Sequence, residues 1–122
     1  MKYYLLFTVL FLFVNCSNND DNSQGSITCT EVFVSGINVQ VIDASTGTII
    51  PQGITVTIKD GDYTEVLAFS FDTFFGAGER PGNYIITAMG NGYISKTIGP
   101  IEVTEDECHV IPVQLEISLT PN

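Results

Sequence analysis

The sequence predicts an all-β protein, a β-sandwich of about seven antiparallel strands, preceded by an export leader and a polar linker. Beyond Ile27 the apolar residues alternate with a period of two, and no window places them convincingly at helical spacing. Turn-forming residues separate the alternating segments, as at Asp60–Gly61 and Gly90–Gly92. Short alternating strands with turns at regular spacing are typical of antiparallel sandwiches.

The first fifteen residues have the pattern of a secretory leader. Lys2 precedes an apolar run from Tyr3 to Val14 that ends next to Cys16. The run is shorter than the roughly 20 residues that a membrane-spanning helix needs. An apolar run ending at a cysteine resembles the lipobox of bacterial lipoproteins, which implies that diacylglycerol alkylates the Cys16 thiol. We therefore predict a lipoprotein signal peptide over residues 1–15, with an ordinary cleaved leader as the alternative.

A polar linker follows Cys16. The segment "SNNDDNSQGS" contains no apolar side chain, so it cannot bury enough surface to offset the entropy of ordering it. Residues 16–26 are predicted to be the lipidated cysteine and a flexible tether. Two acids soon after the cysteine resemble the export tag of some Gram-negative lipoproteins, which implies an outer-membrane location; display at the cell surface stays open.

Three segments of the first half are predicted to be strands. The first two, "GINVQVID" and "ITVTIKD", alternate apolar and polar residues and are expected to be half-buried. After the Asp60–Gly61 turn, "YTEVLAFSF" is expected to return as one strand of a hairpin, with Leu67, Phe69 and Phe71 in phase.

Three more strands are expected in the second half. The segment "RPGNYIITAM" is apolar on both faces and is expected to be central. In "YISKTIGPIEV", Pro100 lacks an N–H, so this strand should be an edge strand or bend there. The last strand is expected over "CHVIPVQLEISL", and His109 shares the parity of its apolar face, which comprises Ile111, Val113, Leu115, Ile117 and Leu119.

The order of four motifs carries a family resemblance. "VQVIDASTG", "DGDYTE", "GAGERPGNYIITAMGNGY" and "IEVTEDECHVIPVQLEISLTP" together resemble the carboxypeptidase regulatory-like domain, in its lone-domain form from bacterial lipoproteins. The resemblance covers nearly all of residues 29–122. It implies a prealbumin-like sandwich without a catalytic role, acting as an accessory or docking module. We therefore expect an immunoglobulin-like or prealbumin-like domain over residues 27–122.

Charge limits the range of partners. Asp and Glu number 14 against 4 Lys and Arg, a formal net charge of -10. Nucleic-acid binding requires clustered basic residues and is not expected. Attachment to anionic lipid through charge is disfavoured for the same reason. The expected partners are the membrane, through the lipid anchor, and an unknown protein or glycan.

Cys29 and Cys108 remain once Cys16 is assigned to lipid. An exported protein meets an oxidising compartment, so this even pair is predicted to form a disulfide, with buried free thiols as the alternative. Neighbouring strand residues point to opposite faces, so Cys108 and His109 should not converge on one atom. His109 is expected at the rim of the core with its ring hydrogen-bonded.

No metal, cofactor or catalytic residue is expected. A zinc site needs three or four ligands, and this chain offers one histidine beside the paired cysteines. The acids of "KDGDYTE" and "TEDE" do not match a calcium loop and fit turns, although calcium binding stays open. A nucleophile would have to use the sole histidine as its base, so a small hydrolase is only a remote alternative.

The adjacent Phe74 and Phe75 are the candidate binding patch. If their segment is extended they must face opposite ways, so either one of them is exposed or they pack under the loop at 76–82. The expected function is a non-catalytic binding or accessory domain on a lipid anchor. The alternative is a structural subunit of an envelope complex.

Overall fold

The computed structural model describes residues 27–122. The predicted signal peptide, the lipidation site Cys16 and the tether lie outside the described residues. Within them, no helix is long and apolar enough to span a membrane.

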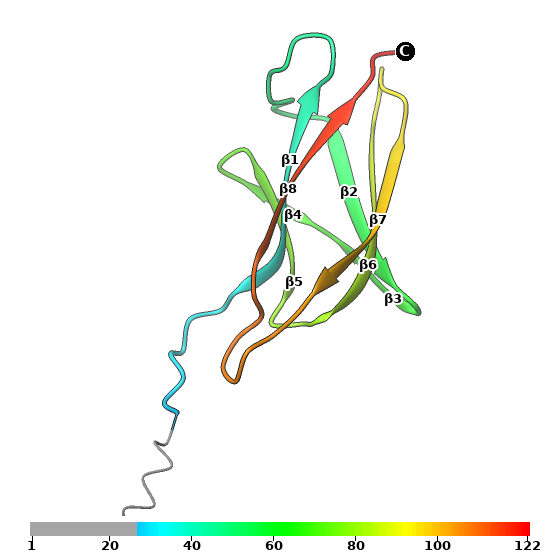
Figure 1. Cartoon of the computed structure of the whole chain (residues 1–122). Coiled ribbons are helices and arrows are strands. Elements are labelled where there is room, and N and C mark those ends of the chain that lie inside the picture. Colours follow the sequence, from blue (N-terminus) through cyan, green and yellow to red (C-terminus); the bar gives the residue numbers. More distant parts are fainter. Residues whose placement is uncertain (1–26) are drawn as a thin grey trace, which may run out of the picture.

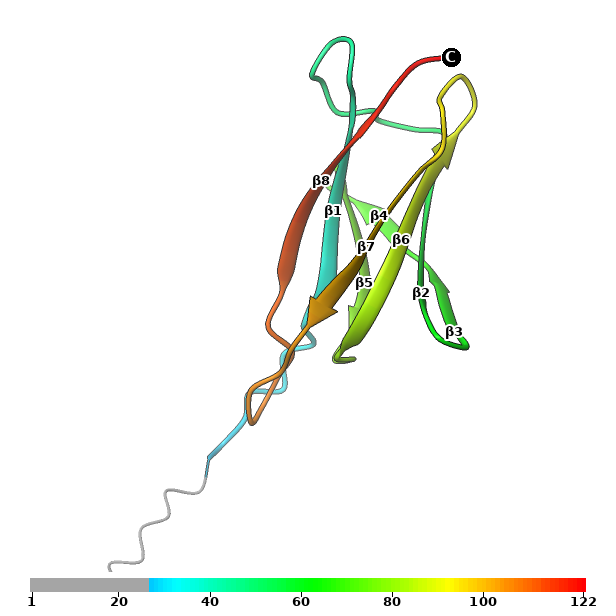
Figure 2. The same ribbon diagram turned by 45° about the vertical axis from the view of Figure 1, so that its right-hand side comes forward.

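Eight strands form two four-stranded sheets packed face to face (Figure 1; Figure 2). The first sheet has the order β4-β5-β1-β8 and the second the order β3-β2-β6-β7. This arrangement confirms an all-β sandwich. The strands are β1 (Ser35–Asp43), β2 (Ile54–Asp60), β3 (Tyr63–Val66), β4 (Ala68–Ser70), β5 (Thr73–Gly78), β6 (Gly82–Gly90), β7 (Lys96–Val103) and β8 (Val113–Leu119).

One strand pair departs from the predicted antiparallel pattern. β1 and β8 run parallel, in register from Ile37 opposite Val113 to Asp43 opposite Leu119. The cause is the crossover at residues 104–112, which carries the chain from the end of β7 to the beginning of β1 in the other sheet. β8 therefore starts where β1 starts and runs in the same direction.

The core lies between the two sheets and consists of the inward side chains that the alternation predicted. On β1, Ile37 and Val39 are fully buried, and on the central strand β6 so are Tyr84 and Ile86. The outward side of β6 carries Ile85, which is 39% exposed, so apolar residues on both faces did not mean burial on both. The other fully or almost fully buried core residues include Val41, Val56, Ile58, Ala77, Ala88, Val103, Ile117 and Leu119.

The segment expected as one strand after the Asp60–Gly61 turn is divided between the sheets. β3 pairs with β2, whereas β4 pairs with β5 in the opposite sheet. The chain changes sheets at Leu67, whose backbone N–H donates to the Val56 carbonyl at 2.8 Å and whose side chain is buried. Leu67 points into the core from the crossing point itself, so the alternation of buried and exposed residues continues through the crossing and ends in β4, where all three residues are exposed.

β7 is the edge strand of the second sheet, as Pro100 predicted. The peptide bond between Gly99 and Pro100 is cis, and the pairing of β6 with β7 shifts register between Tyr84 and Ile86. An edge strand has no neighbouring strand on one side of its backbone, so a proline is tolerated there.

The last strand is shorter than predicted, because it begins at Val113 rather than at Cys108. Val110 is buried and Ile111 is 50% exposed, which is the reverse of the expected parity. Pro112 separates the loop from the strand, so the phase of the strand does not extend back to the loop. His109 consequently lies in the β7–β8 loop, and its placement cannot be derived from strand alternation.

Candidate functional site

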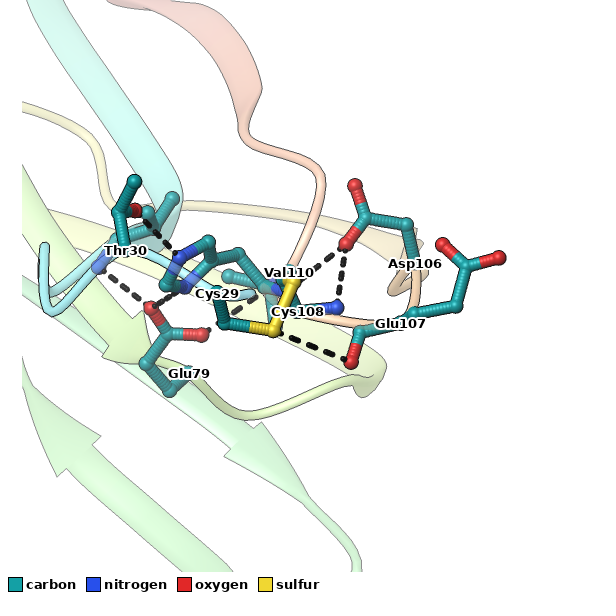
Figure 3. Close-up of polar contacts among 9 residues, drawn as sticks. Cys29, Thr30, Glu79, Asp106, Glu107, Cys108 and Val110 are labelled. Atoms are coloured by element: carbon teal, nitrogen blue, oxygen red, sulfur yellow. Dashed lines mark hydrogen bonds and ion pairs between the residues drawn. A yellow bond between two sulfur atoms is a disulfide. The ribbon is translucent and has the colours of Figure 1, made fainter. Parts of the chain in front are cut away.

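A disulfide joins Cys29 to Cys108, as the sequence predicted, with their Cα atoms 5.2 Å apart (Figure 3). It connects the segment before β1 to the β7–β8 loop, across 79 positions of sequence. These two thiols are therefore not free. The two segments that it joins lie at the end of the sandwich where the described chain enters the fold (Figure 1).

Asp106 organises the loop that carries Cys108. Its Oδ1 accepts the backbone N–H of Cys108 at 2.8 Å and that of His109 at 2.9 Å. The N–H of His109 and then that of Cys108 lower the pKa of Asp106 below its ordinary value. This acid is therefore part of a turn, as the sequence suggested.

The ring of His109 is hydrogen-bonded at both nitrogens. Nδ1 lies 2.7 Å from Oε1 of Glu79, and Nε2 lies 3.0 Å from Oγ1 of Thr30. In the neutral tautomer whose Nδ1–H donates to the carboxylate, Nε2 accepts from the hydroxyl. The ring is about one-fifth exposed, which places it at the rim, as expected.

Glu79 joins three segments at this end of the sandwich. Besides His109, its carboxylate accepts the backbone N–H of Val34 at 2.9 Å and that of Val110 at 3.3 Å. Burial opposes ionisation of this carboxylate, but the Val34 N–H, the His109 ring and the Val110 N–H together lower its pKa below the ordinary value of 4.5. We call Glu79, His109 and Thr30, together with the disulfide, the entry clamp.

The order carboxylate, imidazole, hydroxyl in the entry clamp is also the order of a nucleophile with its base and orienting group. Acyl transfer would require in addition a cavity for substrate and donors for a developing oxyanion. The two cavities described below lie in other parts of the sandwich. The Glu79 carboxylate is engaged by backbone N–H groups from two segments, which is the arrangement of a structural clamp.

Sequence reasoning did not identify Glu79 or Thr30 as partners of His109. They lie 30 and 79 positions away from it. No local spacing connects them, because only the closed sandwich brings the β5–β6 turn and the segment before β1 together. Glu79 has a left-handed backbone, with φ of 49°, in the turn between β5 and β6.

Two of the three carboxylates of "KDGDYTE", those of Asp60 and Glu65, are engaged by protein donors. Asp60 forms an ion pair with Arg80 at 3.0 Å, and Glu65 accepts the Tyr63 hydroxyl at 2.7 Å. The Arg80 guanidinium also lies over the Tyr63 ring, 3.8 Å from its centroid. Over residues 27–122, no three His, Cys, Asp or Glu side chains come together in a way that could hold a metal ion.

Phe74 and Phe75, the candidate binding patch, lie on β5 with their side chains on opposite faces, as expected of an extended segment. Phe74 is a core residue with 5% exposure, so little of its side chain is open to solvent. Phe75 is half-buried on the other face. The strongly exposed aromatic of this region is Phe71, with 97% of its surface accessible, in the turn between β4 and β5.

Beside this turn is a small apolar cavity of about 160 Å³, which we call the lateral mouth. It opens between the end of the β1–β2 connection and the β4–β5 hairpin. One wall is Phe69, whose ring centroid lies 4.8 Å from that of Phe74. The lining residues are Ile50, Pro51, Gln52, Gly53, Ile54, Phe69 and Phe74.

A second, wider depression of about 410 Å³ lies over the ends of β2 and β6. It is open to solvent and is lined by Gly53, Thr55, Met89, Gly90, Asn91 and Ser95. None of these side chains is titratable, so the depression has no acid or base in its lining that could activate the hydroxyls of Thr55 and Ser95.

Comparison with known proteins adds no relative. No model of a known protein family matches the chain, and no curated protein matches it significantly. Function must therefore be argued from the sequence motifs and from the geometry above.

Proposed function

We propose that this protein is a lipid-anchored lipoprotein of the Gram-negative outer membrane whose β-sandwich is a non-catalytic binding or accessory domain for a protein or a glycan. Within this proposal, Cys16 carries the lipid and residues 16–26 are the tether. No nucleic acid and no cofactor take part.

The observation that carries the proposal is the position of the disulfide. A stable cystine is typical of an exported protein, which agrees with the leader and the lipobox-like cysteine. It also lies where the chain enters the sandwich, so a pull on the tether acts on a covalent bond before it acts on the pairing of β1. The β6–β7 turn and the tip of the β1–β2 connection lie at the other end (Figure 1), free for recognition.

The finer fold assignment is an immunoglobulin-like or, more specifically, a prealbumin-like sandwich of the carboxypeptidase regulatory-like group. The motif order given above is its main support. The eight-stranded, two-sheet architecture is compatible with it. Further support comes from Tyr84, whose hydroxyl donates to the Arg80 carbonyl at 2.6 Å, because a tyrosine bonded to the backbone a few residues upstream is a recurrent corner in immunoglobulin-like sandwiches.

The assignment as non-catalytic is tested on the entry clamp, the only place where the described residues line up a hydroxyl, an imidazole and a carboxylate. Hydrolysis of p-nitrophenyl acetate by the protein and by its Thr30→Val variant should proceed at equal rates. A rate that falls when Thr30 alone is changed would support the remote hydrolase alternative.

The alternative function as a structural subunit is favoured by one observation. β8 is an edge strand of seven residues, and one side of its backbone has no partner strand among the described residues. An envelope protein could add a strand there. A recognition domain would instead bind its ligand away from β8.

The lipoprotein part of the proposal is tested by expressing the full sequence in a Gram-negative host, beside its Cys16→Ser variant. We expect the amino-terminal peptide of the first protein to carry diacylglycerol and to fractionate with the outer membrane, and the variant to lose both properties. Equal membrane retention of the two proteins would refute the anchor. Binding is then tested with a glycan array and by crosslinking in envelope preparations; one stable partner that is held through β8 would favour the structural alternative.

A further inference from the structure

The β4–β5 hairpin has an unfavourable turn for its sequence. Its two central residues, Phe71 and Asp72, have φ of 49° and 62°. This is a type I′ geometry, in which asparagine and glycine are preferred, whereas a bulky side chain in the left-handed region is an outlier. An outlier of this kind is a reason to look for a function at the same place.

The Phe71 side chain offers no compensation within the fold. It is 97% exposed, so it contributes almost no burial that could offset the conformation of its backbone. Two residues earlier, Phe69 is 43% exposed and forms a wall of the lateral mouth. The hairpin therefore contributes one aromatic wall of the apolar cavity and, two residues further along, exposes a second aromatic side chain to solvent.

The size of the lateral mouth restricts what can enter it. At about 160 Å³ it is close to the engineered apolar cavities of about 150 Å³ that hold one benzene molecule, and it is below the roughly 300 Å³ at which pockets for larger ligands begin. One aromatic or branched aliphatic group fits; a long acyl chain does not. Gln52 is the only polar side chain in the lining, which is too little for the hydroxyls of a sugar ring.

The backbone beside the cavity suits an extended peptide. β4 is the edge strand of the first sheet, and it is joined to β5 by a two-residue turn with Ser70 opposite Thr73. In such hairpins the residues flanking the turn bond to each other, so Phe69 directs its own N–H and C=O away from β5. No described strand pairs with that side of β4.

Charge defines the partner further. The lining of the lateral mouth has no charged residue, and the adjacent turn contributes Asp72. The three described basic residues, Lys59, Arg80 and Lys96, lie outside the cavity lining and the hairpin, in a chain of net charge -10. A complementary partner is basic, and a second copy of this acidic chain is electrostatically disfavoured.

We propose that the lateral mouth and the β4–β5 hairpin bind an extended segment of a partner protein, which inserts one apolar side chain into the cavity and carries a lysine or arginine beside it. The segment pairs with the free edge of β4, Phe71 covers the inserted side chain, and Asp72 faces the basic residue. This inference rests on the proposed binding function and specifies its ligand class as protein. In strand addition, backbone bonds contribute affinity and side-chain pockets contribute specificity.

The test uses protein made from the full sequence and placed in lipid nanodiscs, against a phage-displayed library of linear peptides, with empty nanodiscs for counter-selection. We expect enrichment of peptides with an apolar residue next to Lys or Arg. Titration of a selected synthetic peptide should shift the methyl resonances of Ile50 and Ile54 in the mouth and leave those of Ile94 and Ile111 unchanged. Its affinity should fall several-fold as salt rises from about 50 to 500 mM, since salt screens the charge pair.

A matched pair of variants distinguishes specific binding at the β4–β5 hairpin from non-specific binding to exposed apolar residues. Phe71→Asn suits the left-handed turn, so the variant should fold at least as stably, yet bind the selected peptide about tenfold more weakly, as expected for an aromatic hot spot. Ile111→Asn makes the same kind of change at another exposed apolar residue, in the β7–β8 loop, and should bind like the unmodified protein.

Four results would overturn the inference. They are no enriched peptide family, methyl shifts confined to residues away from the mouth, unchanged affinity of the Phe71→Asn variant, and mouth shifts that appear on raising the protein concentration alone, which would indicate a second copy. A positive glycan array with no selected peptide would retain the proposed binding function while rejecting the peptide site. If the proposed binding function itself is wrong, neither the glycan array nor the peptide selection will give a ligand.

Discussion

Replacing Cys29 and Cys108 together by serine should destabilise the domain strongly. The bond closes a separation of 79 residues, and a loop of that length loses about 15 cal/mol/K of closure entropy, or about 4.5 kcal/mol at 25 °C. Domains of this size are stable by about 5–15 kcal/mol, so the loss is a large part of the total. The midpoint of thermal unfolding should fall by on the order of 15–30 °C.

The measurement is urea unfolding of residues 27–122, followed by far-ultraviolet circular dichroism, for the disulfide-bonded protein and the double serine variant. The variant should also show a somewhat larger denaturant slope, because an unfolded chain without the cross-link exposes more surface. Reduction of the unmodified protein by dithiothreitol is the control for the side-chain change and should give the same curve. A loss below about 1 kcal/mol with an unchanged slope would contradict the long-loop reasoning.

Three further predictions concern single positions, each followed by urea unfolding. Gly36→Ala should lose about 1–3 kcal/mol, because the new Cβ would lie 2.9 Å from the backbone carbonyl oxygen of Ala77; an unchanged midpoint would contradict this close packing. Tyr84→Phe should lose about 1–2 kcal/mol, since the buried hydroxyl donates to the Arg80 carbonyl and accepts from its guanidinium. The lowered pKa of Glu79 means that its carboxylate stabilises the folded protein fully above pH 4.5, and that this stabilisation is lost as the pH falls through the folded pKa. The free energy of unfolding should therefore fall less steeply with acidification in Glu79→Gln than in the unmodified protein. An equally steep fall would contradict this reasoning.

Alternation predicted which side chains enter the core because the period of a strand assigns residues directly to its faces. Ile37 and Val39 on β1, and Val56 and Ile58 on β2, are all buried as expected. The same rule cannot tell which sheet a strand joins. At Leu67 the chain passes from one sheet to the other while the side chain still points inward, so the sequence shows one strand where the structure has two.

Alternation also failed wherever a turn reset the phase. Phe71 shares the parity of Phe69, yet two left-handed residues follow the end of β4 and leave Phe71 in solvent. The alternation of β8, continued back past Pro112 into the loop, predicts a buried Ile111 and an exposed Val110. The structure has the reverse, with Val110 buried and Ile111 exposed. The backbone geometry at a few turn positions determines whether these side chains are buried, and hydrophobic periodicity carries no information about that geometry.

The entry clamp lay beyond sequence reasoning for a different reason. The cysteine pair could be predicted, because the number of cysteines and the compartment leave few pairings. The partners of His109 could not, because a carboxylate or hydroxyl anywhere in the chain satisfies the same chemistry. Glu79 and His109 are neighbours only in the closed sandwich, in which β5 pairs with β1 and Cys108 fastens the loop after β7.

Stabilising and destabilising features lie in different parts of the sandwich. The segment at which the chain enters is held by a covalent bond and by the carboxylate of Glu79, and its polar groups are matched to one another. The β4–β5 hairpin keeps an exposed Phe71 in a conformation that asparagine or glycine would adopt at lower cost. Folding accounts for the first arrangement and not for the second, since Phe71 buries almost nothing. A role in binding would account for it, and such a role belongs on the side hairpin, away from the clamped point of entry.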